Sequence, residues 1–318
     1  MRAINTNRVR SLVVVALSIA AVACAVPGVA NADQPVMRIA FPSGMNGQIV
    51  VTMDKAGIAE QSGLKAKFDS FQYGPPMMEA LAAGSIDAVV TSLMPVTSYA
   101  AKIPGDIRIV AMVGQSSHSL MVDKSGGIAT LDALAGKKLG VSFGSDSHLD
   151  TLVWLKEKGL ADKISLVNIA PAELATALGN KSVDAIVIRQ PQVLRLQQQS
   201  GAQILHTWPF RFVSIVKTKF IAEHPQEVEK YIAALRKAIL FIAQNQQKSA
   251  EWFGEYLRTD PAVVMAASKD DPFYAATDLG QIDIAVKPDS RALIGKWAAD
   301  AFEHKMIRQK LDLDSLFR

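Results

Sequence analysis

The stretch LAAGSIDAVV at residues 81–90 recurs as LGNKSVDAIV at residues 178–187, which is 97 residues further along the chain. Flanking segments repeat at nearly the same spacing, since IAFPS at residues 39–43 is matched by VSFGS at residues 141–145. A period of about one hundred residues is the size of a domain or lobe, and it is too long for a solenoid repeat. The repeat therefore predicts two similar lobes with a cleft between them.

Each copy of the repeat has the pattern strand, helix, strand, helix, strand. Short apolar runs predict the strands, and helical spacing, prolines and glycines predict the helices and their ends. The expected strands are residues 36–41, 64–71 and 87–92 in the first copy and 138–143, 164–169 and 185–188 in the second. The expected helices run through 55–61 and from Gly74, and then over 147–158 and 171–178. This order predicts an α/β fold in which each lobe has a parallel sheet covered by helices.

Two further strands, 119–122 and 213–218, are expected to pair where the chain crosses between the lobes and to form a hinge. Beyond them, helical spacing predicts helices over 225–245, 247–257, 261–269 and 291–305, which have no counterpart in the second copy. We therefore expect them to complete the first lobe. The predicted organisation is a leader over 1–32, the first part of lobe 1 over 33–117, lobe 2 over 118–214 and the rest of lobe 1 over 215–318.

The first 32 residues have the features of a secretory signal peptide. Three arginines precede an apolar run over 12–26, and Ala30-Asn31-Ala32 provides a small-residue cleavage site. Cys24 offers an alternative as a lipid-modified terminus, but Ala21 stands where a larger aliphatic residue is expected. The pattern favours a free protein in the periplasm.

The positive charge of the whole chain belongs mostly to this leader. The chain has 34 Lys and Arg against 30 Asp and Glu, and removal of the leader leaves a net charge of about +1. This balance argues against nucleic acid or an anionic membrane surface as a partner. Cys24 is the single cysteine and the five histidines lack ligand spacing, so we expect no disulfide, no metal and no cofactor.

Ligands of open parallel sheets bind beyond the carboxyl ends of the strands, where helix N-termini present free N–H groups. Small polar residues stand at these places in both copies: Ser43, Asn46, Gly74, Pro75, Thr91, Ser92, Gln115 and Ser116 in the first, and Ser145, Ser147 and His148 in the second. Ser145 or Ser147 could equally be a helix N-cap without a ligand role. Convergence from two lobes favours the binding interpretation.

Arg189 is the one full charge expected at a strand end that faces the cleft. Its planar guanidinium suits a carboxylate, sulfonate or phosphate, so it suggests an anionic ligand. The alternative is that Arg189 extends to solvent or pairs with an acid such as Asp184. Nearby methionines are expected in the core, although Met94 could form a soft apolar wall of the site.

Three long segments resemble solute-binding proteins of ABC importers for sulfonates, taurine, nitrate and thiamine precursors. They are FQYGPPMMEALAAGSIDAVV at 71–90, LDALAGKKLGVSFGSDSH at 131–148 and NIAPAELATALGNKSVDAIVIRQP at 168–191. The resemblance spans almost the whole mature chain. It implies the type II periplasmic-binding-protein fold, with two α/β lobes around a hinge and cleft, and a monomer that delivers its ligand to the membrane subunits of a permease.

Carried over by position, the resemblance places ligand contacts at Ser43, Asn46, Gly74, Pro75, Ser92, Met94, Gln115, Ser116, Ser145, Ser147, His148 and Arg189. One departure concerns the ligand. Sulfonate and nitrate members usually have a Trp and an acid before the proline that matches Pro191, whereas this chain has Arg189-Gln190. The change makes the site more positive, which disfavours taurine and favours a purely anionic, sulfonate-like ligand.

Two other functions remain open at this stage. A sensor protein could use the same binding fold to report its ligand to a membrane receptor. A serine hydrolase would use Ser142 of GVSFG with Asp184 and His206, in the chain order of α/β-hydrolases. A nucleophile elbow requires its serine on the turn after the strand, and Ser142 is expected inside the strand, so the hydrolase is the more distant alternative.

Overall fold

The computed structural model describes residues 34–317, and the chain from Pro35 onward packs as one compact unit. The predicted signal peptide and Cys24 lie outside the described residues. Within residues 34–317, no helix combines the length and the apolar character that are needed to cross a bilayer.

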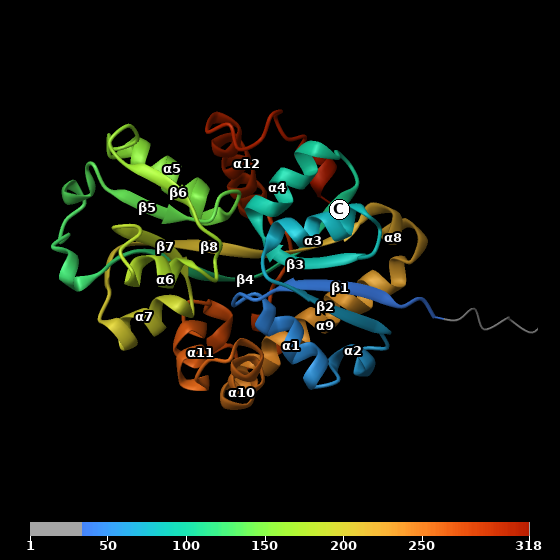
Figure 1. Ribbon diagram of the computed structural model, residues 1–318. Helices are drawn as coiled ribbons and strands as arrows, with labels where there is room; N and C mark the ends of the chain where they lie inside the picture. Colours follow the sequence, from blue (N-terminus) through green and yellow to red (C-terminus); the bar gives the residue numbers. More distant parts are fainter. Residues whose placement is uncertain (1–33, 318) are drawn as a thin grey trace, which may run out of the picture. The chain divides into compact units, whose positions relative to one another are not determined.

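A single eight-stranded sheet runs through the described part of the chain, in the order β2-β1-β3-β8-β4-β7-β5-β6. Its strands are β1 (Met37–Pro42), β2 (Ala66–Phe71), β3 (Ala88–Ser92), β4 (Ile107–Val122), β5 (Lys138–Val141), β6 (Ser165–Asn168), β7 (Ala185–Arg189) and β8 (Gln203–Lys217). In each repeat the first strand is central and parallel to both of its neighbours, β2 and β3 around β1 and β6 and β7 around β5. The predicted α/β fold with parallel strands in both copies is confirmed (Figure 1).

The aspartate of the repeated motif has the same structural role in both copies. Asp87 accepts a hydrogen bond from the Arg38 backbone N–H at 2.9 Å, and Asp184 accepts one from the Lys138 N–H at 2.8 Å. In each case the backbone N–H of the aspartate also donates to the carbonyl of the same partner. The motif therefore ties the start of the last strand in each repeat to the start of the first, which explains its recurrence in structural terms.

The crossing strands are much longer than expected. β4 and β8 pair antiparallel along most of their length, but residues 213–217 face 107–112, whereas 119–122 face 203–207. The predicted pairing of 119–122 with 213–218 was therefore wrong, because short apolar runs do not determine the register of two long strands. The predicted lobe boundaries at 117/118 and 214/215 fall inside these strands and remain a prediction.

Twelve α-helices cover the sheet in the described residues (Figure 1). They are α1 (Gly47–Lys55), α2 (Ile58–Gln61), α3 (Gly74–Ala82), α4 (Leu93–Lys102), α5 (Asp146–Glu157), α6 (Leu174–Gly179), α7 (Gln192–Ser200), α8 (Thr218–Glu223), α9 (Pro225–Gln244), α10 (Gln246–Leu257), α11 (Pro261–Ser268) and α12 (Pro288–Glu303).

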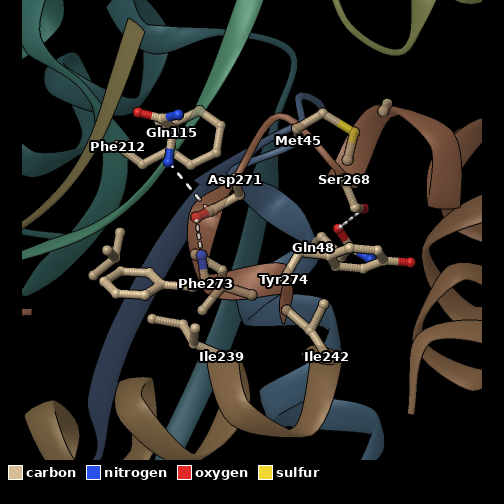
Figure 2. A pocket seen from close by; sticks show the side chains of 13 residues that line it. Met45, Gln48, Gln115, Phe212, Ile239, Ile242, Ser268, Asp271, Phe273 and Tyr274 are labelled. Carbon is tan, nitrogen blue, oxygen red and sulfur yellow. Dashed lines mark hydrogen bonds between the residues drawn. The ribbon is translucent and has the colours of Figure 1, made fainter. Parts of the chain in front are cut away.

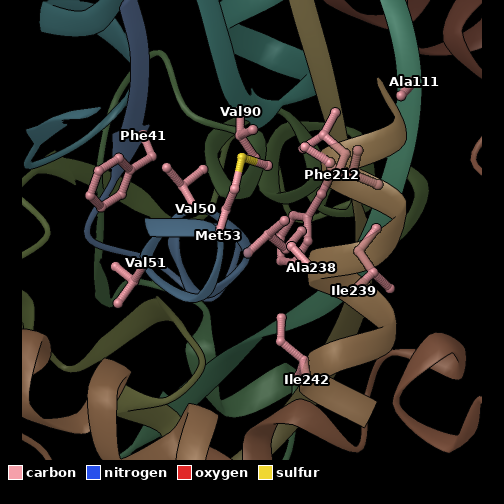
Figure 3. Close-up of a cluster of buried hydrophobic side chains, with 14 of the residues drawn as sticks. Phe41, Val50, Val51, Met53, Val90, Ala111, Phe212, Ala238, Ile239 and Ile242 are labelled. Carbon is pink, nitrogen blue, oxygen red and sulfur yellow. The ribbon is translucent and has the colours of Figure 1, made fainter. Parts of the chain in front are cut away.

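Among the helices at the end of the chain, α9 and α10 pack against α1 of the first repeat, and their assignment to the first lobe remains a prediction. Val50 and Met53 of α1 share a buried cluster with Ile239 and Ile242 of α9 and with Phe212 of β8 (Figure 3). Burying such side chains contributes roughly 1.5–3 kcal/mol each relative to exposure. α12 instead packs on α4 and also reaches α5 of the second repeat.

Candidate functional site

A cavity of about 320 Å³ lies at the carboxyl ends of β1, β3, β5 and β7 and receives residues from both repeats. Seven of the predicted contact residues line it: Ser43, Gly74, Pro75, Ser92, Ser145, Ser147 and Arg189. Thr91 and Gln190, which flank two of them in sequence, line it as well. The position agrees with the rule that ligands of parallel sheets bind beyond the strand ends.

Part of the wall comes from residues that the sequence analysis did not single out. Tyr256 and Leu257 reach the cavity from the end of α10, and Gln72 and Tyr73 precede the helix that begins at Gly74. The helical spacing over 247–257 predicted only a helix, and no local signal separates a core tyrosine from one that lines a cavity. The positions of Tyr256 and Leu257 in the cavity wall depend on how α10 packs on the first repeat.

Phe143 is an exposed aromatic residue in this wall. Its side chain is 42% exposed and stacks on the His148 ring, with 4.3 Å between ring centroids and 6° between planes. Burial lowers the pKa of His148 to about 4, so the ring is neutral near pH 7. His148 does not itself line the cavity, and it accepts a hydrogen bond from the Gly144 N–H at its Nδ1 atom.

The serine hydroxyls of the cavity are held by neighbouring groups. Ser43 donates to the Gln72 carbonyl at 2.9 Å, and Ser145 donates to the Ser142 carbonyl at 2.6 Å. Ser145 is also the N-cap of α5, since its Oγ accepts from the His148 N–H. The N-cap alternative therefore describes Ser145 correctly, and this role leaves the residue in the wall of the cavity.

Arg189 is paired inside the protein rather than free to meet a ligand alone. Its Nη2 atom lies 3.1 Å from Oδ2 of Asp146, and its guanidinium lies 4.8 Å from the centre of the Phe210 ring. Asp146 is fully buried and also accepts hydrogen bonds from the Ser92 hydroxyl and, at 3.1 Å, from the Met94 N–H. The partner of Arg189 is therefore Asp146, and Asp184 instead accepts from Lys138.

A second buried pair lies near Arg189. His118 Nε2 is 3.0 Å from Oδ2 of Asp150, and His118 contacts the rings of Trp208 and Phe210. Burial and the nearby Arg189 charge lower the pKa of His118 to about 3. Burial and the nearby Asp146 charge raise the pKa of Asp150 to about 8. Both shifts favour the neutral form of the group concerned.

The other predicted contacts do not line the cavity. Asn46 and Ser116 are buried, and their Nδ2 and Oγ atoms have no hydrogen-bond partner. Met94 is fully buried beside Leu149 and Ala301. Gln115 lies at a separate pocket of about 30 Å³, where its backbone N–H donates to Asp271 (Figure 2). Contact of these residues with a ligand remains a prediction.

The residues of the hydrolase alternative are not assembled into a triad. The Ser142 hydroxyl donates to the Ile169 carbonyl, Asp184 accepts from Lys138, and His206 packs against Trp154 and Trp208. β5 ends at Val141, so Ser142 follows the strand and does not lie within it as expected. Within residues 34–317, no group of three or more His, Cys, Asp or Glu side chains is placed to hold a metal ion.

Residues 60–249 match the profile of the family described as NMT1/THI5 like. The chain belongs to this family. It is 28% identical over 212 residues to a Bacillus subtilis protein named as an aliphatic sulfonates-binding protein, with 64% of each chain covered. This match spans less than two thirds of that relative's length. A binding protein of Brucella abortus is 25% identical over 269 residues, with 80% of this chain and 81% of that protein covered.

Solved structures of periplasmic binding proteins share the fold. The Escherichia coli aliphatic sulphonate binding protein SsuA has a TM-score of 0.76 at 20% identity, with 89% of this chain and 92% of that chain covered. The Xanthomonas axonopodis pv. citri alkanesulfonate-binding protein SsuA bound to MOPS has a TM-score of 0.77 at 18% identity, with 90% and 100% covered. The nitrate-binding protein NrtA of Synechocystis PCC 6803 has a TM-score of 0.72 at 12% identity, with 90% and 86% covered. The fold is therefore that of a periplasmic binding protein.

Proposed function

We propose that this protein is an exported solute-binding protein that captures a small organic anion, most readily a sulfonate, and delivers it to the membrane subunits of an ABC permease. One observation carries the proposal. The cavity is lined by hydroxyl and amide groups that follow the strands of both repeats, so a ligand would contact two lobes at once.

The size of the cavity favours an organic solute. A volume of about 320 Å³ is at the lower end of the range for small-molecule sites and far exceeds the volume of a nitrate ion. Its wall combines serines with aromatic residues and prolines, among them Tyr73, Phe143, Tyr256 and Pro171. Such a lining suits a polar head group attached to an apolar body. The names of the relatives support a sulfonate as the head group.

Binding would act through closure of the cleft. A ligand that docks on one lobe and gains contacts from the other binds the closed form more tightly, and this difference in affinity shifts the population toward closure. A permease that recognises the closed form would then accept loaded protein in preference to empty protein. No covalent step is required.

Titration calorimetry on the purified mature protein tests the proposal, with alkanesulfonates, arenesulfonates, taurine, nitrate and carboxylates as ligands. We expect binding of one or more sulfonates and weaker binding of nitrate and taurine. Tight binding of nitrate alone, or of no anion in the panel, would contradict the proposal. Loss of uptake of the bound sulfonate on deletion of the gene distinguishes import from a sensor role.

A further inference from the structure

Three hydrogen-bond donors beside the cavity converge on a carboxylate of the protein itself. Ser92 donates its hydroxyl to Oδ2 of Asp146, the Met94 N–H donates to Oδ1, and Arg189 donates Nη2–H to Oδ2. Anion-binding sites are commonly built from such donors: a hydroxyl, an N–H at a helix N-terminus and a guanidinium. Here these donors bind the Asp146 carboxylate of the second repeat instead of a ligand.

The Asp146 carboxylate lies at the N-terminus of α4. Ser92 is the N-cap of this ten-residue helix, but its side chain caps no N–H of α4. Asp146, the first residue of α5, supplies the missing acceptor for Met94 instead. Two of the three donors, Ser92 and Arg189, line the cavity directly, so the carboxylate lies immediately behind the cavity wall.

The fixed charges of the site consequently cancel. Among the described residues that line the cavity, Arg189 is the one formally charged side chain, and Asp146 offsets it at 3.1 Å. His118 and Asp150, the titratable groups near this pair, are mainly neutral near pH 6 because burial lowers the pKa of the first and raises that of the second. A ligand therefore meets hydroxyls, amides and helix dipoles, and residues 34–317 present it with no uncompensated positive side chain.

We propose that Asp146 is a specificity-determining residue that occupies an anion subsite and restricts the cavity to ligands with a single negative charge. This inference rests on the proposed function and narrows its ligand class. A monoanion such as a sulfonate or sulfate ester needs only the partial charges of helix N-termini and polar hydrogens. A dianion such as a phosphate monoester has a second charge, and the described residues of the cavity wall offer it no uncompensated cation because Asp146 already pairs with Arg189.

The decisive experiment compares butyl sulfate with butyl phosphate at pH 7, where the first is a monoanion, the second is mainly a dianion and Asp150 is still mainly protonated. The two probes have the same tetrahedral head and the same chain, and their affinities are measured by calorimetry for the wild type and the Asp146→Asn variant. Asn keeps the shape and one acceptor oxygen but removes the charge. We expect Asp146→Asn to improve the affinity for butyl phosphate relative to butyl sulfate at least tenfold.

Two controls separate charge from structure. Asp271→Asn changes a half-buried carboxylate that accepts hydrogen bonds from the Gln115 and Phe273 N–H groups outside the cavity, and it should leave the ratio unchanged. The double variant Asp146→Asn with Arg189→Gln should lose the improved affinity for butyl phosphate. The guanidinium that Asp146→Asn frees from its ion pair is absent from that protein. An unchanged or lower preference for butyl phosphate in folded Asp146→Asn protein overturns the proposal.

A measurement on the wild type covers the case in which Asp146→Asn does not fold. Butyl phosphate becomes a monoanion below its second pKa of about 6, whereas butyl sulfate keeps its charge. Wild-type affinity for butyl phosphate, measured against butyl sulfate, should rise about fivefold or more from pH 7 to pH 5, and a constant ratio would refute the role of Asp146. Failure of the proposed function would give a different result. The wild type would then bind no sulfonate or sulfate ester, while Asp146→Asn would still gain affinity for butyl phosphate.

Discussion

Gly84 and Lys181 occupy the same position in the two repeats and both have a left-handed backbone, with φ of 74° and 60°. Each ends the helix before the repeated strand, and the next residue closes the turn, through Ser85 N–H to the Ala80 carbonyl and Ser182 N–H to the Ala177 carbonyl. This pattern is a Schellman cap, in which glycine carries no steric penalty and lysine does.

Lys181→Gly should therefore stabilise the protein. The expected gain in the free energy of unfolding is about 0.5–1 kcal/mol, because relief of the left-handed strain exceeds the extra entropy of glycine in the unfolded chain. Urea denaturation measures it. The matched change Gly84→Ala should cost about 1 kcal/mol, although space around Gly84 is open. Destabilisation by Lys181→Gly would show that the lysine side chain makes a larger contribution than its strained backbone costs.

Arg189→Ala should destabilise the fold as well as weaken ligand binding. Removal of the guanidinium leaves the buried Asp146 carboxylate without its countercharge, and breaking a buried pair in this way costs about 3 kcal/mol. Thermal and urea unfolding measure the loss. In the Arg189→Ala background, Asp146→Asn should recover most of it, and equal stability of the single and double variants would contradict the pairing.

Arg189→Ala should also weaken an anionic ligand by about 1.5–3 kcal/mol, the scale of a charge-assisted hydrogen bond. Calorimetry on the Arg189→Ala protein is done at a temperature where unfolding curves show it to be native. Undiminished affinity would remove Arg189 from the ligand contacts and leave it with the structural role alone.

Asp150→Asn should change how stability depends on pH. The folded pKa of Asp150 is about 8 against an ordinary value of 3.8, so the folded protein holds a proton that the unfolded chain releases between these values. This contribution to stability is complete below pH 4 and is lost as the pH rises to 8. The free energy of unfolding of the wild type should therefore fall by about 1.4 kcal/mol per pH unit, relative to that of Asp150→Asn, from pH 5 to pH 7.

Urea unfolding at several pH values measures this slope. The buried His118 has the opposite dependence, since its lowered pKa makes stability rise between about pH 3 and its ordinary value of 6.5. That contribution is present in both proteins and largely cancels in their difference. A difference that stays constant with pH would mean that Asp150 is ionised in the folded state.

Asp87→Asn should cost more stability than Asp184→Asn. Both aspartates accept a backbone N–H at the start of a neighbouring strand, but Asp87 also accepts two bonds from the Arg38 guanidinium. The expected losses are about 1–2 kcal/mol for Asp87→Asn and about 0.5–1 kcal/mol for Asp184→Asn. Chemical denaturation of both proteins provides the comparison, and the reverse ranking would contradict it.

Most of the fold could be predicted from local patterns. Apolar runs, prolines and glycines placed the strands of both repeats within a few residues, because these signals depend on neighbours in the chain. The errors occurred where distant packing decides. The α6 helix begins at Leu174 rather than Pro171, and β4 and β8 extend far beyond the short apolar runs that predicted them.

The residues of the candidate site also fall into two groups, those that local sequence predicts and those that only tertiary packing places. The residues that directly follow strands, such as Ser43, Ser92, Ser145 and Arg189, line the cavity, because the end of a parallel strand has a defined direction. Tyr256 could not be foreseen, since its helix has no counterpart in the repeat. Asp146 lies in the polar segment GSDSH at 144–148, and nothing in that segment indicated that its side chain would be buried.

By itself the sequence determined a duplicated α/β unit, the direction of its strands and the polar residues at their ends, because periodicity and turn chemistry are local properties. Only the tertiary structure decided that one continuous sheet joins the repeats and that Asp146 meets Ser92, 54 residues away, and Arg189, 43 residues away. Hydrogen bonds and charge compensation depend on distances in space. The net charge that a ligand meets in the cavity is therefore a property of the packed repeats and not of either motif alone.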